Sequence, residues 1–358
     1  SYKLILINSS DILEDDMYII GTVGPTVKDR TVLKGIIDGG ANALRFNFAH
    51  GSNDEFLEFL KTAREIKPDI SIMLDTSGTK LRISNKFQYI YKIYDGEEIF
   101  FCGEDKYEII KTVINQYRSK IIPLNIKNDM LHENEFSSIS IKDNTMIFEV
   151  IEKNDELIRA KAIKGGVIRK GKGCNIKGFN RSMLSLSKED KKAIIWGIRN
   201  NVNIICQSFV ESAQDVKEVK KFIEDHKGDE TNIKIWAKVE TSNGANNIKN
   251  ILNEADGIVI GRGDLIPETS IEETPIYEER IIREVSKNKE KDLIIGTHIF
   301  NSMKSGKIPQ LSEVESVYNF IKNGVTGFLL AGETSIGKAP VKTVKFLKDL
   351  ERIYNGNS

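Results

Sequence analysis

Short apolar runs alternate with amphipathic stretches along the first part of the chain. The run Tyr18–Thr22 predicts a buried strand, and the sequence from about Asp29 to Ile37 predicts a helix after it. Ala43–Phe48 predicts a second strand, Asp54–Ile66 a second helix and Ser71–Thr76 a third strand. Strands that alternate with helices of about 10–15 residues indicate parallel βα units.

The alternation of strands and helices stops between residues 83 and 174. Short alternating runs such as Ser137–Ile141 and Met146–Ile151 are typical of antiparallel strands. Turn-forming sequences, including Asp95-Gly96 and Lys142-Asp143-Asn144, separate these runs. We therefore expect residues 83–174 to form a small, mostly antiparallel, barrel-like β domain inserted into an α/β scaffold.

The βα rhythm then resumes. Ser187 is the expected N-cap of a helix that carries Glu189 and Asp190 in its first turn. The strands predicted after this helix are Asn203–Phe209, Ile233–Glu240, Gly257–Arg262, Asp292–Thr297 and Gly327–Gly332. With the three strands before the insert they make eight βα units, the number that closes a (β/α)₈ barrel. We predict a TIM barrel over residues 1–82 and 175–358, with the β domain inserted after its third strand.

The stretch Ile233–Glu240 alternates apolar and polar residues for about one strand length. Lys238 and Glu240 are two residues apart, so both side chains point to the same face of a strand. A cation and a carboxylate on one face suit a site for an oxyanion and a metal ion. The alternative is a solvated cross-strand ion pair on an edge strand.

Polar side chains gather at the predicted strand ends, which is where barrels place their chemistry. They are Arg45, Asn47, Asp75, Thr76, Ser208, Lys238, Glu240, Arg262, Asp264, Thr297, Glu333 and Thr334. The carboxylates Glu240 and Asp264, without His or Cys, favour Mg²⁺ or Mn²⁺. Lys238 and Arg45 favour a phosphorylated anionic substrate. The glycine-rich stretch Gly261–Leu265 follows a strand, so its N–H groups could bind a carboxylate or phosphate.

Composition narrows the range of functions. Lys plus Arg and Asp plus Glu both number 52, so the chain has no net charge to attract nucleic acid or a membrane surface. No apolar run reaches the roughly 18 residues that a membrane helix needs. The three cysteines, Cys102, Cys174 and Cys206, are far apart, which argues against zinc and disulfides and favours a reducing compartment.

Several short motifs occur in the order and spacing of one enzyme family. They are Gly24-Pro25, Arg45-Phe46-Asn47-Phe48-Ala49-His50-Gly51, Asp75-Thr76-Ser77-Gly78, Lys238-Val239-Glu240, Gly261-Arg262-Gly263-Asp264-Leu265 and Gly332-Glu333-Thr334. With a β insert after the third strand, the chain resembles the pyruvate kinase family from about Ile20 to Ile353.

The resemblance implies transfer of the phosphoryl group of phosphoenolpyruvate to ADP, giving pyruvate and ATP. Glu240 and Asp264 would hold the divalent ion, and Lys238 would neutralise the migrating phosphoryl group and the enolate oxygen. Backbone amides near Gly263 and Asp264, with the Thr297 hydroxyl, would hold the substrate carboxylate. Thr297 would also lie near the proton route to the enolate carbon.

Other roles follow from the same resemblance. Arg45 and Arg82 would contact the transferring phosphate, and Ser208 would belong to the substrate-binding set. The residues toward the nucleotide would be Asn47, His50, Arg82 and Lys172. The insert would close over the site as a lid and exclude water, which favours transfer to ADP over hydrolysis.

The site for a monovalent cation departs from the family pattern. Asn47, Asp75 and Thr76 are present, but Ala49 stands where the family has a serine. Lys80 stands where potassium-dependent members have glutamate. An ammonium group there could supply the charge that K⁺ supplies elsewhere, so we expect an enzyme that does not require K⁺.

The resemblance also implies a further C-terminal domain, which binds allosteric effectors and builds half of the interfaces of a homotetramer. The sequence stops at Ser358, where that domain would begin, so we expect a fragment or a reduced form of a homo-oligomer. The first residue is Ser1 rather than Met, which is compatible with a removed leader. We expect a cytoplasmic location, or an organelle such as a plastid if a leader has been removed.

The sequence is compatible with two other functions. One is a Mg-dependent aldolase or lyase of 2-oxo acids from the phosphoenolpyruvate and pyruvate barrel superfamily, although Lys238 and the insert argue against it. The other is a catalytically silent pyruvate-kinase-like subunit. Such a subunit should have lost its charged site, whereas Lys238, Glu240 and Asp264 are all present.

Overall fold

Eight parallel strands close into a barrel in a computed structural model that describes residues 16–114, 119–182, 184, 186–229 and 231–355. The barrel strands are β1 (Tyr18–Thr22), β2 (Ala43–Asn47), β3 (Ser71–Asp75), β13 (Ile204–Gln207), β14 (Lys234–Val239), β15 (Gly257–Gly261), β16 (Asp292–Gly296) and β17 (Gly327–Leu330). Their order around the barrel follows the sequence, with β17 paired to β1. The predicted TIM barrel is confirmed, while residues 1–15 and 356–358 lie outside the described residues.

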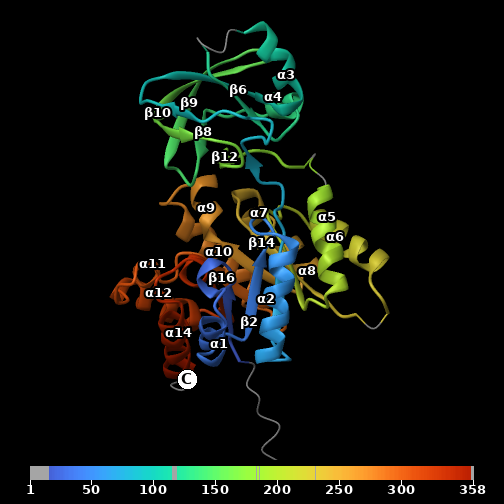
Figure 1. Cartoon of the computed structure of the whole chain (residues 1–358), viewed down its shortest axis with the longest axis vertical. Helices are drawn as coiled ribbons and strands as arrows, with labels where there is room; N and C mark the ends of the chain where they lie inside the picture. Colours follow the sequence, from blue (N-terminus) through green and yellow to red (C-terminus); the bar gives the residue numbers. More distant parts are fainter. Residues whose placement is uncertain (1–15, 115–118, 183, 185, 230, 356–358) are drawn as a thin grey trace, which may run out of the picture.

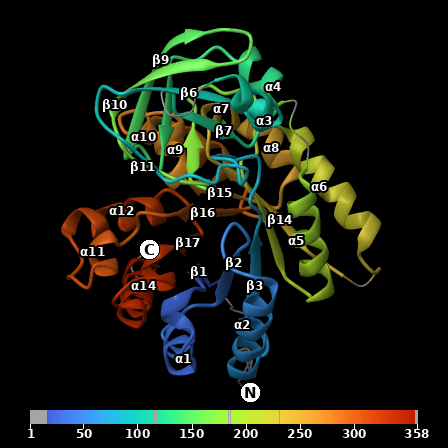
Figure 2. The ribbon, with the colours of Figure 1, turned by 45° about the horizontal axis from the view of Figure 1, so that its top comes forward.

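Helices surround the barrel strands (Figure 2). They are η1 (Pro25–Val27), α1 (Arg30–Asp38), α2 (Asn53–Ile66), α5 (Lys188–Arg199), α6 (Ala213–His226), α7 (Ser242–Asn246), α8 (Ile248–Glu254), α9 (Arg262–Glu268), α10 (Thr274–Val285), α11 (Asn301–Lys304), α12 (Leu311–Lys322), α13 (Gly332–Ser335) and α14 (Pro340–Asn355). The predicted cap of α5 is confirmed, because the Ser187 hydroxyl accepts the N–H of Asp190 at 3.1 Å.

Two layers of apolar side chains hold the barrel together. Residues that point inward from the strands, including Ile20, Met73 and Trp236, form one buried cluster inside the barrel. Residues that point outward pack against the helices in a larger cluster, to which Trp196 contributes. Trp236 is fully buried and donates its indole N–H to Asp292 at 3.0 Å, so it is a packing residue.

The insert is a second unit with its own core. Its strands are β4 (Leu81–Arg82), β5 (Tyr91–Ile93), β6 (Glu98–Gly103), β7 (Ile121–Leu124), β8 (Ser138–Ile141), β9 (Met146–Lys153), β10 (Ile158–Lys164), β11 (Gly166–Ile168) and β12 (Gly173–Asn175). They form one sheet in the order β4-β12-β8-β9-β10-β6-β7 and a separate β11-β5 pair. Within the described residues only the β6–β7 pairing is parallel, so the expected antiparallel character is confirmed.

Sequence reasoning missed two helices in the insert, α3 (Glu104–Val113) and α4 (Asn128–Glu133). Tyr107 and Ile110 of α3 are buried against the insert's sheet. In a domain of short alternating runs, the four apolar positions of α3 and the two of α4 are too few to stand out as a helical period.

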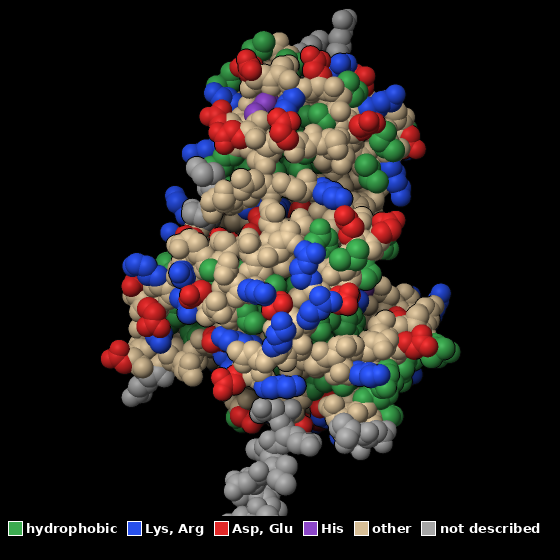
Figure 3. Space-filling model, turned by 180° about the vertical axis from the view of Figure 1, so that it is seen from behind, with side chains coloured by type: hydrophobic (Ala, Val, Ile, Leu, Met, Phe, Trp, Pro, Cys, Tyr) green, Lys and Arg blue, Asp and Glu red, His purple; other side chains and the backbone are tan. Residues whose placement is uncertain are grey.

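The insert lies over the carboxyl ends of the barrel strands, with α9 directly below it (Figure 1). The chain enters the insert through β4 and leaves it through β12, and these two strands pair with each other. The surface carries Lys, Arg, Asp and Glu side chains interspersed on the face shown in Figure 3, in keeping with the balanced composition. No helix among the described residues is long and apolar enough to cross a membrane.

Candidate active site

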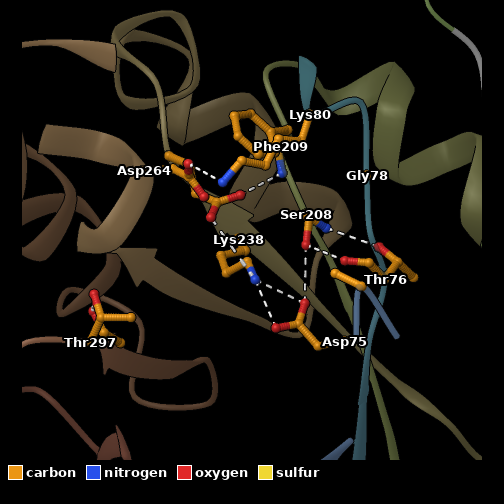
Figure 4. Close-up of polar contacts among 12 residues, drawn as sticks. Asp75, Thr76, Gly78, Lys80, Ser208, Phe209, Lys238, Asp264 and Thr297 are labelled. Carbon is orange, nitrogen blue, oxygen red and sulfur yellow. Dashed lines mark hydrogen bonds and ion pairs between the residues drawn. The ribbon is translucent and has the colours of Figure 1, made fainter. Parts of the chain in front are cut away.

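A buried ion pair between Lys238 and Asp75 lies at the mouth of the barrel (Figure 4). Lys238 is on β14, and its Nζ donates to the two carboxylate oxygens of Asp75, the last residue of β3, at 2.9 and 2.7 Å. Burial disfavours the charge of Lys238, but Asp75 and Glu240 raise its pKa, so the side chain is an ammonium ion. Because β14 is buried between β13 and β15, the alternative of an exposed edge-strand ion pair is wrong.

Arg45 and Ser208 complete the contacts of Asp75. Arg45 of β2 donates from Nε to Asp75 Oδ2 at 2.7 Å. The Ser208 hydroxyl, which follows β13, lies 3.0 Å from Asp75 Oδ1 and 2.5 Å from the carbonyl oxygen of Thr76. Burial raises the pKa of Asp75, but Lys238 and Arg45 outweigh it and bring the pKa below its usual value. Asp75 is therefore an anion shared by two cations.

Glu240 follows β14 and lies beside Lys238. Its Oε1 is 3.9 Å from Lys238 Nζ, and its Oε2 accepts the backbone N–H of Phe209 at 2.9 Å. Gly261, at the end of β15, permits this position, because a Cβ there would lie 2.6 Å from Glu240 Cγ. Burial raises the pKa of Glu240; Lys238 opposes this rise, whereas the charges of Asp264 and Asp75 add to it.

Asp264 belongs to the first turn of α9 and meets residues next to the insert. Lys80 Nζ donates to Asp264 Oδ1 at 2.8 Å, and Asn175 Nδ2 donates to the same oxygen at 3.3 Å. Lys80 passes close to Gly173, where a Cβ would lie 2.6 Å from Lys80 Cε. Burial raises the pKa of Asp264, but the ammonium of Lys80 and the amide of Asn175 lower it below its usual value.

Glu240 and Asp264 fit one divalent cation. Glu240 Oε1 and Asp264 Oδ2 accept no hydrogen bond from the described residues. Mg²⁺ and Mn²⁺ prefer carboxylate oxygens as ligands, and either cation would offset the repulsion between these two carboxylates. Across the described ranges there is no group of three or more His, Cys, Asp and Glu side chains placed to hold a metal. Further ligands would thus have to come from water or substrate, as is usual for Mg²⁺.

The expected monovalent group is arranged differently from the prediction. Asn47 Oδ1 accepts the N–H of Ala49 at 3.1 Å, and Asp75 is occupied by the two cations described above. The sequence predicts that Lys80 adds its charge to this group, whereas its ammonium contacts Asp264. The reason is that Lys80 immediately precedes β4, whose pairing with β12 carries it toward the insert. Among the described contacts, none joins Lys80 to Asn47, Asp75 or Thr76.

Thr297 lies apart from the charged cluster, at the end of β16 (Figure 4). Thr297 and His298 have φ of 68° and 55°, a left-handed conformation that is uncommon for residues other than glycine. Arg262 supports this turn by donating to the carbonyl oxygens of both residues at 2.8 Å. A Cβ on Gly263 would lie 3.5 Å from Thr297 Oγ1, so the hydroxyl neighbours the first turn of α9.

Two other strand-end residues support the backbone. Glu333 accepts the N–H groups of Ile299, Phe300 and Ala331 at 3.3, 3.2 and 2.9 Å. Thr334 exchanges hydrogen bonds with the backbone of Thr22, each of 2.8 Å. These backbone contacts account for the presence of both residues at the strand ends, and no ligand is needed to explain it.

Two of the predicted nucleotide-side residues, Arg82 and Lys172, lie where the chain enters and leaves the insert. Arg82 of β4 donates to the carbonyl oxygen of Gly171 at 3.2 Å, and the Lys172 carbonyl oxygen accepts the N–H of Ile83 at 2.8 Å. Partial burial lowers the pKa of His50, and the nearby charges of Arg82, Arg45 and Lys80 lower it further. His50 therefore samples a positive potential of the kind that attracts anions.

Sequence reasoning missed a buried group behind Asp264. It consists of Asn175 at the end of β12, Arg181 in the segment that follows, and Glu268 at the end of α9. Arg181 and Glu268 form an ion pair of 2.6 Å. The signal for Glu268 is its position one helical turn after Asp264, which places both on one face of α9. Nothing in the local sequence marks Arg181.

The geometry brings four cations and three carboxylates to one mouth. Such a site can neutralise an anion that carries several charges and can hold one divalent ion against it. Lys80, Lys238 and Arg45 contribute positive charge from three different strands or their ends, and Arg82 contributes it from the insert.

Comparison with known proteins gives one family. The family model "Pyruvate kinase, barrel domain" matches residues 15–344. A pyruvate kinase of Sporosarcina psychrophila is 31% identical over 335 residues, which are 91% of this chain and 55% of the relative. A pyruvate kinase of Geobacillus stearothermophilus is 28% identical over 93% of this chain and 56% of the relative. The chain spans about half the length of the curated relatives it matches.

Proposed function

The chain belongs to the pyruvate kinase family, and from this membership we propose that it transfers the phosphoryl group of phosphoenolpyruvate to ADP. The bond from phosphorus to the enol oxygen breaks, and a bond to a terminal oxygen of ADP forms. The enolate then takes a proton at carbon and becomes pyruvate. The relatives that the chain matches are named pyruvate kinases.

The observation that carries the proposal is the ammonium of Lys238, held between Asp75 and Glu240 at the barrel mouth. Charge spreads over the phosphoryl oxygens during transfer, and catalysis consists mainly of positioning and charge stabilisation. Lys238 faces that charge, and Arg45 adds a second cation to the same carboxylate. Asp75 fixes both cations so that little reorganisation is needed during the reaction.

Glu240 and Asp264 would hold the divalent ion through the oxygens that accept no hydrogen bond from the described residues. When bound, that ion would supply positive charge against the anionic substrate. The N–H groups near Gly263 and Asp264 bind the substrate carboxylate together with the Thr297 hydroxyl. Thr297 also lies toward the proton route to the enolate carbon.

The remaining substrate contacts come from the two ends of the insert and from the end of β2. Arg82 contacts the transferring phosphate, and Asn47, His50 and Lys172 lie toward ADP. The insert excludes water by closing on the mouth, which favours ADP over water as the acceptor. Support comes from the positive potential that Arg82, Arg45 and Lys80 create at His50.

We further propose that the reaction does not require K⁺. Support comes from Lys80, whose ammonium adds a fixed positive charge to the mouth, and from Ala49, which lacks the hydroxyl of the family's serine. The ammonium of Lys80 donates to Asp264, so its charge reaches the site through that carboxylate. A fixed ammonium makes a mobile monovalent cation redundant for charge balance.

The test is ATP formation by the purified chain from phosphoenolpyruvate and ADP, with Mg²⁺ present or removed by a chelator. We expect ATP and pyruvate in equal amounts only when Mg²⁺ is present. Cleavage of a 2-oxo acid without ATP formation would instead identify an aldolase or lyase, and binding of phosphoenolpyruvate without turnover would identify a silent subunit.

A further inference from the structure

Arg181 is a buried cation at the junction between the insert and the barrel. It is 5% exposed and lies six residues after β12, in the segment that returns the chain to the barrel. Its Nη2 donates to Glu268 Oε1 at 2.6 Å, and its Nε donates to the carbonyl oxygen of Thr79 at 3.4 Å. Glu268 is 2% exposed, so the ion pair is shielded from solvent.

The first link from this ion pair leads to Asp264. Asn175 donates from Nδ2 to Glu268 Oε1 and to Asp264 Oδ1, in both cases at 3.3 Å. Glu268 and Asp264 also share one face of α9, one turn apart. Arg181 therefore fixes Glu268, Glu268 fixes the amide of Asn175, and that amide orients the carboxylate of Asp264.

The second link leads to Glu240. The guanidinium of Arg181 lies over the ring of Phe209, 4.6 Å from its centroid. The backbone N–H of Phe209 donates to Glu240 Oε2 at 2.9 Å, from a left-handed backbone conformation with φ of 55°. Holding the ring in place holds this strained turn and hence the N–H that orients Glu240.

We propose that Arg181 is the positioning residue that sets the spacing of Glu240 and Asp264 for one shared divalent cation. The inference deepens the proposed function, because it rests on the metal site assigned there. Partners of metal ligands orient them, and their loss commonly weakens metal binding. Arg181 acts on both carboxylates at once and touches neither.

Stability alone does not account for the arrangement. A buried ion pair contributes little compared with apolar side chains of similar volume, because both charges lose their hydration. Moreover, Arg181 Nη1, Asn175 Oδ1 and Thr79 Oγ1 are buried without a hydrogen-bond partner among the described residues. A polar group that stays partly unsatisfied costs stability, whereas the contacts that it does make converge on the two carboxylates.

The experiment measures Mn²⁺ binding to the chain without substrates, by the electron paramagnetic resonance signal of free Mn²⁺. We expect Arg181→Met to raise the dissociation constant about tenfold or more, and Arg181→Lys to lie between this variant and the wild type. Arg64→Met is the matched control, because Arg64 also bridges two segments, donating to the carbonyl oxygens of Asn200 and Asn201 away from the mouth. Equal Mn²⁺ affinity in Arg181→Met and wild type overturns the proposal.

The double variant Arg181→Met/Glu268→Leu keeps the test valid if the single variant does not fold. It removes both buried charges together, so we expect a folded protein whose Mn²⁺ affinity stays about tenfold below that of the wild type. Restoration of wild-type affinity in this variant would assign the pair to stability alone. Because the readout needs no turnover, a wild-type chain that binds Mn²⁺ but forms no ATP contradicts the proposed function and leaves this inference standing. A wild-type chain that binds no Mn²⁺ overturns the inference.

Discussion

Asp75 and Asp264 are both carboxylates held by cations at the barrel mouth, but their partners come from different parts of the chain. Lys238, Arg45 and Ser208 hold Asp75, and all three stand on or directly after barrel strands. Asp264 is held by Lys80 and Asn175, which lie at the two ends of the insert. One half of the site belongs to the barrel, and the other half forms where the insert joins it.

The two carboxylates therefore depend on different parts of the fold. The contacts of Asp75 form whenever the barrel closes, so they link stability and chemistry. The contacts of Asp264 depend on where β4 and β12 enter and leave the insert, so they would link the proposed metal site to the placement of the insert. Variants of the barrel half and of the junction half should therefore change different measurable quantities.

The largest effect is expected for Lys238→Met. We expect the ammonium to stabilise the negative charge that develops during transfer. Without it, kcat should fall by roughly 10³-fold or more, with a much smaller change in KM. Steady-state kinetics with phosphoenolpyruvate and ADP measure both constants. Lys234→Met is the matched control, since Lys234 lies at the other end of the same strand, 3.1 Å from Asp292. A rise in KM without a fall in kcat would exclude this role.

Asp75→Asn tests the barrel half through stability. The change removes the carboxylate that pairs with Arg45 and the nearer of the two carboxylates beside Lys238, so the free energy of unfolding should fall by about 3 kcal/mol or more. Urea unfolding at neutral pH measures the loss. The comparison variant is Asp38→Asn, because Asp38 forms an exposed ion pair with Lys34 one helical turn away and should change stability by less than about 0.5 kcal/mol. Similar losses in both variants would contradict the argument.

Lowering the pH should reduce the stability that the barrel half of the site contributes. The pKa of Asp75 in the folded protein lies below its ordinary value of about 3.9, so folding favours the ionised form. That stabilisation is complete above the ordinary pKa and is lost as the pH falls through the lowered pKa of the folded state. Urea unfolding at a series of acidic pH values should show a steeper loss for wild type than for Asp75→Asn. Parallel curves would mean that Asp75 does not carry the effect.

The smallest effect is expected for K⁺. Replacing K⁺ with a bulky organic cation at constant ionic strength should change kcat by less than about twofold, because Lys80 supplies a fixed charge in the mouth. Strong activation by K⁺ would show that the ammonium on Asp264 does not replace the monovalent cation.

The barrel was predictable because each strand is a short apolar run that ends at polar residues. Lys238 and Glu240 could be assigned to one face from their spacing, and Ser187 to a helix start from its chemistry. The junction was not predictable, because Lys80 and Asp264 are 184 residues apart and Arg181 and Glu268 are 87 apart. Such partners are set by how the insert packs on the barrel, and no local pattern encodes that.

The packing of the tryptophans has a practical consequence. Both tryptophans of the chain, Trp196 and Trp236, belong to the barrel, while the insert carries tyrosines such as Tyr89, Tyr91 and Tyr107. Fluorescence excited selectively in tryptophan thus reports on the barrel and gives no signal from the insert. Fluorescence of a single sample can therefore distinguish a chain in which only the insert has unfolded from one that has unfolded completely.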